Sequence, residues 1–163
     1  MVEAVAKFNL MGLQSSSNSF SKIDMISFFT NAGISQEVIL RVQTLWEETK
    51  KMAGQVYAIG KIIIIKLIDF IKDNPAMAIG VAMGVGLGFV ASSVPFIGFL
   101  IAPLVTAISV TIGAFRGHRI DRLIKGEDVH NSIIDDAFSI AKTFWAFFSD
   151  IFETLKQYFE EKN

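Results

Sequence analysis

Residue types that carry out chemistry are sparse in this chain. There is no cysteine, and the two histidines, His118 and His130, have no carboxylate motif around them. Thiolate metal sites and thiol nucleophiles are therefore excluded. The paired acids Asp135 and Asp136 fall on the polar side of a predicted helix, where they are solvated. No zinc spacing, phosphate loop or nucleophile motif occurs, so we expect no catalysis, no cofactor and no small-molecule substrate.

The glycine run 84–88, Gly-Val-Gly-Leu-Gly, invites comparison with a dinucleotide-binding fingerprint. Its spacing is wrong for that motif, and no strand is predicted before it. In a helix in water, each glycine costs about 1 kcal/mol relative to alanine. In lipid, small residues every four positions allow a second helix to approach closely. Gly80, Gly84 and Gly88 therefore predict a packing stripe, either against the small residues of a second helix, including Ala102 and Gly113, or between subunits.

This glycine stripe lies in a chain that is unusually rich in apolar residues. Of 163 residues, 52% are hydrophobic, and the mean hydropathy is +0.47. The net charge of −1 predicts no attraction to nucleic acid. Glu3 and Lys7 interrupt the first apolar run, so the N-terminal segment does not have the pattern of a cleavable signal. Any membrane insertion is therefore expected to use internal segments.

The apolar excess is concentrated between Asp73 and Arg116, since residues 74–115 contain no ionisable side chain. This stretch is about twice the ~20 residues that cross a hydrocarbon core once. Pro95 and Gly98 supply turn chemistry near its middle. The pattern predicts a membrane helical hairpin with helices over about 76–92 and 97–115. Its uncharged turn lies within the membrane or reaches the far interface, and both alternatives remain open.

Basic residues flank the predicted hairpin on both sides. Lys72 precedes it, and a compact group follows it, namely Arg116, Arg119, Arg122 and Lys125. Cytoplasmic flanks of membrane helices carry such charges, so we expect both termini on the cytoplasmic side of a membrane. Ionisable residues inside membranes mark proton relays and ion pathways. Their absence from the hairpin argues against a proton-coupled transporter.

Amphipathic helices are predicted around the hairpin. Ser21 and Asp24 form a capping-box pattern for a helix to about Thr30, after a polar linker over 14–21. Ser35 is an N-cap candidate for a helix that reaches Met52. We divide the chain into N-terminal helices over 1–54, an isoleucine-rich interfacial helix over 55–73, the hairpin over 74–115, a basic flank and linker over 116–128, and a final helix over 129–163.

The final helix carries an aromatic apolar face opposite an acidic one. Acids outnumber bases from Glu127 onward, which disfavours purely electrostatic attachment to anionic lipid. The aromatic face could insert into a membrane, pack on the isoleucine-rich helix or bind another protein, and we favour protein–protein packing. The residues expected to face a partner or membrane are Phe138, Trp145, Phe148, Phe152 and Phe159.

Residues 72–88, Lys-Asp-Asn-Pro running into the glycine-rich segment, carry a resemblance to a known family. They resemble the start of the membrane anchor in the small bacterial ElaB/YqjD-type inner-membrane proteins. That family ends after one anchor, whereas here a second apolar helix and a long tail follow, so no functional residue is carried over. The overall layout is also similar to that of pore-forming domains of the colicin type and of membrane-bending hairpin proteins.

Two functions follow as hypotheses. The leading one is a non-enzymatic integral membrane protein, a structural, assembly or membrane-shaping subunit that oligomerises or joins other subunits of a membrane complex. The alternative is a pore-forming effector that hides its hairpin and inserts it into a target bilayer. A third, minor interpretation is a soluble helical bundle with a buried central hairpin.

Overall fold

The computed structural model describes residues 1–108 and 128–159, except for the side chains of residues 128–135. Helix dominates this part of the chain, which confirms the all-α expectation apart from one short two-stranded sheet. Residues 98–108 are helical as well. In chain order, the elements are α1 (Glu3–Ser17), α2 (Lys22–Asn31), α3 (Gln36–Trp46), β1 (Lys50–Met52), β2 (Gln55–Tyr57), α4 (Ile59–Asp73), α5 (Ile79–Ser93), α7 (Asp128–Thr154) and α8 (Lys156–Phe159).

The predicted caps of the N-terminal helices are present. The Ser21 hydroxyl accepts a hydrogen bond from the Asp24 amide, and the Asp24 carboxylate accepts one from the Ser21 amide. The Ser35 hydroxyl accepts from Val38 N at the start of α3. By contrast, α1 extends into the predicted polar linker as far as Ser17, whose hydroxyl donates to Gln14 O in the preceding turn. Serine hydroxyls that bond to their own helix in this way tolerate helical backbone.

The β-hairpin corrects the prediction that a helix reaches Met52. The helix ends at Trp46, and β1 pairs antiparallel with β2 through Lys51 and Val56. Ala53 and Gly54 connect the strands with φ angles of 51° and 83°. Two consecutive left-handed residues are the geometry of a tight hairpin turn that matches strand twist. Alanine is unusual there, which is why the sequence pattern gave no hairpin signal.

The isoleucine-rich helix α4 starts at Ile59, four residues later than predicted, because β2 occupies the preceding residues. Gly60 fixes its contact with α3. A Cβ atom at this position would lie 1.6 Å from the Leu45 carbonyl oxygen, and the Gly60 amide donates to Glu48 O at 3.0 Å. Only glycine fits such a close backbone approach. The junction therefore sets the direction in which α4 enters the core.

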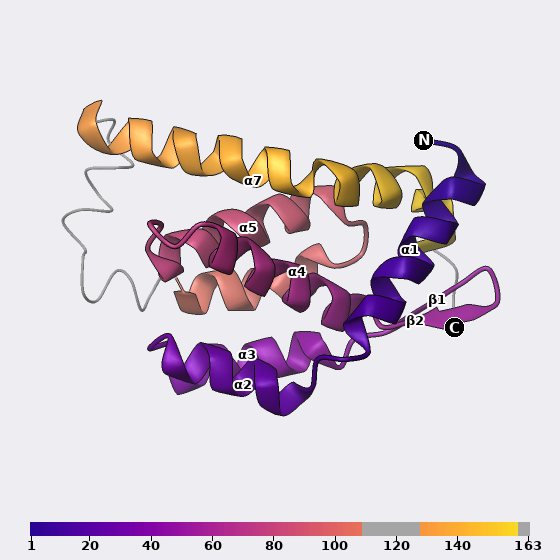
Figure 1. The fold of residues 1–163 in the computed structure, drawn as a ribbon, viewed down its shortest axis with the longest axis horizontal. Helices are drawn as coiled ribbons and strands as arrows, with labels where there is room; N and C mark the ends of the chain where they lie inside the picture. Colours follow the sequence, from indigo (N-terminus) through magenta and orange to yellow (C-terminus); the bar gives the residue numbers. More distant parts are fainter. Residues whose placement is uncertain (109–127, 160–163) are drawn as a thin grey trace.

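The core lies between α4, α5 and α7. In Figure 1 the long helix α7 runs along the length of the molecule beside α5, while α2 and α3 lie on the opposite side, beyond α4. Helix α5 packs against both α4 and α7, and α1 crosses from α4 to α7. Most isoleucines of α4 are buried, as are Trp145 and Phe152 of α7. Apolar burial of this extent is the main favourable contribution to folding.

Within the uncharged stretch, α5 begins at Ile79 where a helix from about 76 was predicted, and residues 98–108 are the described part of the second predicted helix. Helix α5 ends at Ser93, the chain reverses over residues 94–97, and helix resumes at Gly98 (Figure 1). Residues 109–115, the predicted end of the second helix, lie outside the described residues. Within the described part of the chain, no helix combines the length and the apolar character needed to cross a membrane.

Candidate functional site: the uncharged helical hairpin

Helix α5 is apolar on every side, and most of its surface is covered by the rest of the chain. Ala82, Met83, Leu87 and Val90 are buried among α4 and α7. A helix that is hydrophobic all round is stable in water only when it is buried. Here α4 and α7 supply that burial. Helix α5 is thus an internal element of the fold.

Gly86 is the glycine at which α5 approaches another helix closely. A Cβ atom there would lie 2.8 Å from Leu67 Cδ1 and 3.6 Å from Phe70 Cδ1, both on α4. The side chains of α4 therefore occupy the space that a larger residue would need. Small residues at helix contacts permit this close packing.

Two members of the predicted stripe of Gly80, Gly84 and Gly88, namely Gly84 and Gly88, do not make that contact. A Cβ atom at Gly84 or Gly88 would meet no described atom within 4 Å, and Gly88 is exposed. Ala102, an expected partner in the second helix, is also exposed, and Gly113 lies outside the described residues. The predicted packing of this stripe against the second helix of the same chain is therefore wrong for Gly84 and Gly88. Gly84 and Gly88 form an outward line on α5, because the buried side chains of this helix lie mainly on its opposite side.

The turn of the hairpin, residues 94–97, which we call the tip, docks onto distant parts of the chain. Pro95 lies within this turn, where its carbonyl oxygen accepts a hydrogen bond from Ile97 N, and Gly98 is the first residue of the helix that follows. Phe96 has a φ angle of 64°, a left-handed conformation that costs a bulky residue about 1–2 kcal/mol. Its ring stacks on Phe159 at a centroid distance of 5.5 Å, and Lys50 Nζ lies 5.0 Å from its centroid.

Contacts within the chain bury most of the aromatic face of α7 and α8. Trp145, Phe152 and Phe159 are fully buried and Phe148 nearly so, whereas Phe138 remains 51% exposed. This corrects the prediction that all five face a partner or membrane. The reason is that the hairpin and α4 offer an apolar surface within reach, so the helix buries its stripe internally.

These aromatic rings form a continuous row. This aromatic row extends from α4 to the tip and consists of Phe144, Trp145, Phe148, Phe152 and Phe159. Phe144 lies 5.3 Å from Phe70 at one end, and neighbouring rings along the row are 4.4–5.2 Å apart. Such edge-to-face pairs add about 0.5–1.5 kcal/mol each beyond burial. Among the described residues, Trp145 Nε1 is buried without a hydrogen-bond partner, and the indole packs within the aromatic row.

A cluster of polar side chains connects the end of α8 with α1. The Tyr158 hydroxyl donates a short hydrogen bond to the Glu3 carboxylate, which also pairs with Lys7 Nζ at 2.9 Å. The Lys7 ammonium lies 4.2 Å from the centroid of the Tyr158 ring. The hydrogen bond from Tyr158, followed by that from Lys7, lowers the pKa of Glu3. The hydrogen bond to Glu3, followed by that to Tyr158, raises the pKa of Lys7.

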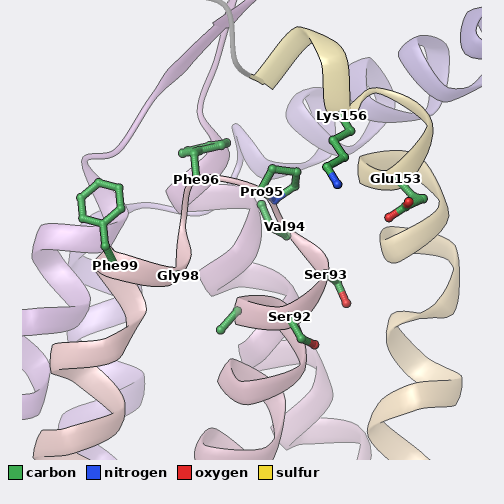
Figure 2. A pocket seen from close by; sticks show the side chains of 10 residues that line it. Ser92, Ser93, Val94, Pro95, Phe96, Gly98, Phe99, Glu153 and Lys156 are labelled. Carbon is green, nitrogen blue, oxygen red and sulfur yellow. The ribbon is translucent and has the colours of Figure 1, made fainter.

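A groove of about 380 Å³ lies between the turn and the junction of α7 with α8, and Phe96, Glu153 and Lys156 are among the residues that line it. Figure 2 shows Lys156 and Glu153 directed toward the turn, with the hydroxyls of Ser92 and Ser93 on the facing side. Phe99 lies at its other edge and is 72% exposed. Among the described residues there is no group of three or more potential metal ligands. The groove thus brings serine hydroxyls, a carboxylate and an ammonium group to one place.

The remaining predicted residues have different positions. Lys72 is exposed at the end of α4, with its Nζ 5.6 Å from the centroid of Phe28. His118 lies outside the described residues, and nothing is described of the His130 side chain. Phe96 and Lys50 were not predicted as site residues, since neither ring stacking nor a left-handed φ angle leaves a signature in the order of residues. The basic residues that follow the hairpin also lie outside the described residues, namely Arg116, Arg119, Arg122 and Lys125.

Comparisons of this chain with protein-family models, with curated proteins and with solved structures gave no match. The resemblance of residues 72–88 to the ElaB/YqjD-type anchor therefore stays a prediction from sequence.

Proposed function

We propose that this protein is a non-enzymatic membrane effector that stores an uncharged helical hairpin beneath amphipathic helices and inserts it into a lipid bilayer. The observation that carries the proposal is the burial of α5, a helix apolar on all sides, under α4 and the aromatic row. A segment without charge gains little from water and transfers readily to hydrocarbon. Of the two hypotheses from the sequence, this arrangement favours the one with a stored hairpin.

The covering helices suit this function because they are amphipathic. Helix α7 presents aromatic rings to the hairpin and polar residues such as Lys142 and Asp150 to water. An amphipathic helix of this kind can exchange one apolar surface for another, since its polar face remains solvated throughout. Transfer of the hairpin would leave α7 to lie in the membrane interface, where its rings bury against lipid.

A second candidate is a hairpin-anchored structural or membrane-shaping subunit that oligomerises or joins other membrane subunits. It is favoured by the outward line of Gly84 and Gly88 together with exposed Ala102, since an exposed small-residue surface suits helix contacts between copies in lipid. Under this proposal the protein is a permanent membrane component, with both termini on the cytoplasmic side. Its lipid-free form would not be the active species.

Vesicle experiments with purified, detergent-free protein test the proposal. We expect the protein to float with phosphatidylcholine vesicles, with or without phosphatidylglycerol, and to release an entrapped dye. Phe99→Lys places a charge at the exposed edge of the tip and should reduce dye release at least tenfold. Ile23→Lys is the matched control, because Ile23 on α2 is 75% exposed and Phe99 is 72% exposed.

The second candidate makes a different prediction in the same assay. A constitutive subunit should be recovered from cells in the membrane fraction after carbonate washing and should cross-link as oligomers, without releasing dye when added to vesicles. Protein that neither floats with vesicles nor sediments with cell membranes would refute both functions.

A further inference from the structure

The tip of the hairpin is held by residues that come from three separate regions of the chain. Phe96 belongs to the turn after α5, Lys50 to β1, and Phe159 to α8. The ring of Phe96 stacks on Phe159 with an interplanar angle of 25°. The tip residues Val94 and Ile97 on either side are buried. The turn is therefore docked against the body of the protein, although hairpin turns usually lie free at the surface.

The backbone of the docked tip is strained. Phe96 is one of two residues other than glycine with a positive φ angle among those described, and the other, Ala53, is in the β-hairpin turn. A bulky residue keeps a left-handed conformation only where the surrounding contacts determine it. Here those contacts are the stack on Phe159 and the approach of the Lys50 ammonium. Their loss would let the Phe96 backbone relax, which favours an undocked tip.

The same contacts connect the tip to the cover of the hairpin. Phe159 lies 4.8 Å from Phe152, the next ring of the aromatic row. The row continues along α7 over the surface of α5. Release of Phe96 from Phe159 therefore removes the end support of the helix that covers the hairpin.

We infer that Lys50, Phe96 and Phe159 form a clasp that keeps the tip docked and the hairpin covered in the absence of lipid. Opening of this clasp is the step that precedes insertion of the hairpin into the bilayer. The inference rests on the proposed function and adds its regulation. The clasp acts before insertion, and its strained residue makes the opening favourable once the stack is lost. Exposed Phe99, three residues beyond Phe96, is then the first aromatic side chain to reach lipid.

A reversible cross-link across the groove tests the clasp directly. The chain has no cysteine, so Ser93→Cys with Lys156→Cys creates the only two thiols, on opposite sides of the groove in Figure 2. A reducible bifunctional maleimide joins them. The control pair is Lys22→Cys with Glu47→Cys, two positions that form an ion pair at 2.6 Å between α2 and the end of α3.

We expect the cross-link at the groove to reduce the rate of dye release from phosphatidylcholine vesicles more than tenfold, and its reduction to restore the rate. The control cross-link should leave the rate unchanged. Equal release by the locked and unlocked groove variants would overturn the clasp and leave the proposed function in place. Absence of release from every variant, including the parent chain, would overturn the proposed function and the clasp together.

Weakening the clasp should have the opposite effect. Phe159→Leu keeps an apolar side chain but removes the stack, and Lys50→Gln removes the cation above Phe96. Each should accelerate dye release about three- to tenfold, as expected from the loss of one ring pair or one cation–π contact. Phe147→Leu, at a 49% exposed position of α7, is the control. Far-UV circular dichroism establishes that each variant is folded, and unchanged rates in folded variants would overturn the clasp.

Discussion

The packing of α7 on the hairpin predicts a large difference between two phenylalanines of the same helix. Phe152 is fully buried, and its ring lies 4.4 Å from Phe148 and 4.8 Å from Phe159. Phe147 is 49% exposed. Replacing either with alanine makes the same chemical change in the same helix. The pair therefore isolates the contribution of burial.

The magnitude follows from the contacts. Truncation of a buried phenylalanine to alanine costs about 3–5 kcal/mol, and the loss of two ring pairs places Phe152→Ala near the upper end of this range. Phe147→Ala is expected to change the free energy of unfolding by about 0.5 kcal/mol or less. Each kcal/mol shifts the melting temperature of a chain of this size by about 2–4 °C. The melting temperature of Phe152→Ala should thus fall by roughly 10–20 °C.

Thermal and urea unfolding followed by far-UV circular dichroism, in buffer without detergent or lipid, measures the difference. If α7 instead kept its aromatic face free for another protein or a membrane, both variants would unfold at nearly the same temperature. Equal melting temperatures for Phe147→Ala and Phe152→Ala would therefore refute the packing of α7 on the hairpin.

Three further predictions concern glycines and charge. Gly88→Ala should raise the free energy of unfolding by about 0.5–1 kcal/mol because alanine favours helix. Gly86→Ala should lower it by up to about 2 kcal/mol, because the cost of displacing Leu67 exceeds the same gain. Urea unfolding of both variants checks the contrast. Gly60→Ala should prevent the close contact of α3 and α4, seen as loss of the cooperative unfolding transition. The pKa of Glu3 is lowered in the folded protein, so its contribution to stability is present above the ordinary glutamate pKa of 4.5 and is lost as the pH falls through the lowered pKa. The difference in melting temperature between the parent and Glu3→Gln should therefore disappear in acid.

Local sequence chemistry accounted for two helix starts and one chain reversal in this fold. Ser21 with Asp24 and Ser35 predicted two helix starts, because capping depends on residues within one turn. Pro95 predicted the reversal after α5 for a similar reason. The β-hairpin was missed, since Ala53 occupies a position where asparagine, aspartate or glycine would have signalled the turn.

Contacts between distant segments were harder to predict. The aromatic face of α7 was correctly identified as apolar, but periodicity gives no partner, and the structure buries Trp145 and Phe159 within the chain. Likewise, the spacing of Gly84 and Gly88 suggested a seam, whereas Gly86 makes the close approach. Whether a glycine of a helix faces the core or the surface depends on how the whole helix is oriented in the fold. Local sequence pattern does not determine that orientation.

The central claim, that an uncharged hairpin stored in the lipid-free protein moves into a bilayer, is tested most directly at Ala102. This residue is exposed, so Ala102→Cys accepts a nitroxide spin label in the cysteine-free chain without disturbing the core. Collisions of the label with a water-soluble nickel complex and with oxygen report its surroundings by electron paramagnetic resonance. We predict access to nickel without vesicles, and loss of that access with a gain of oxygen collisions once vesicles are added. A label that stays equally accessible to nickel on vesicles that bind the protein would contradict the account.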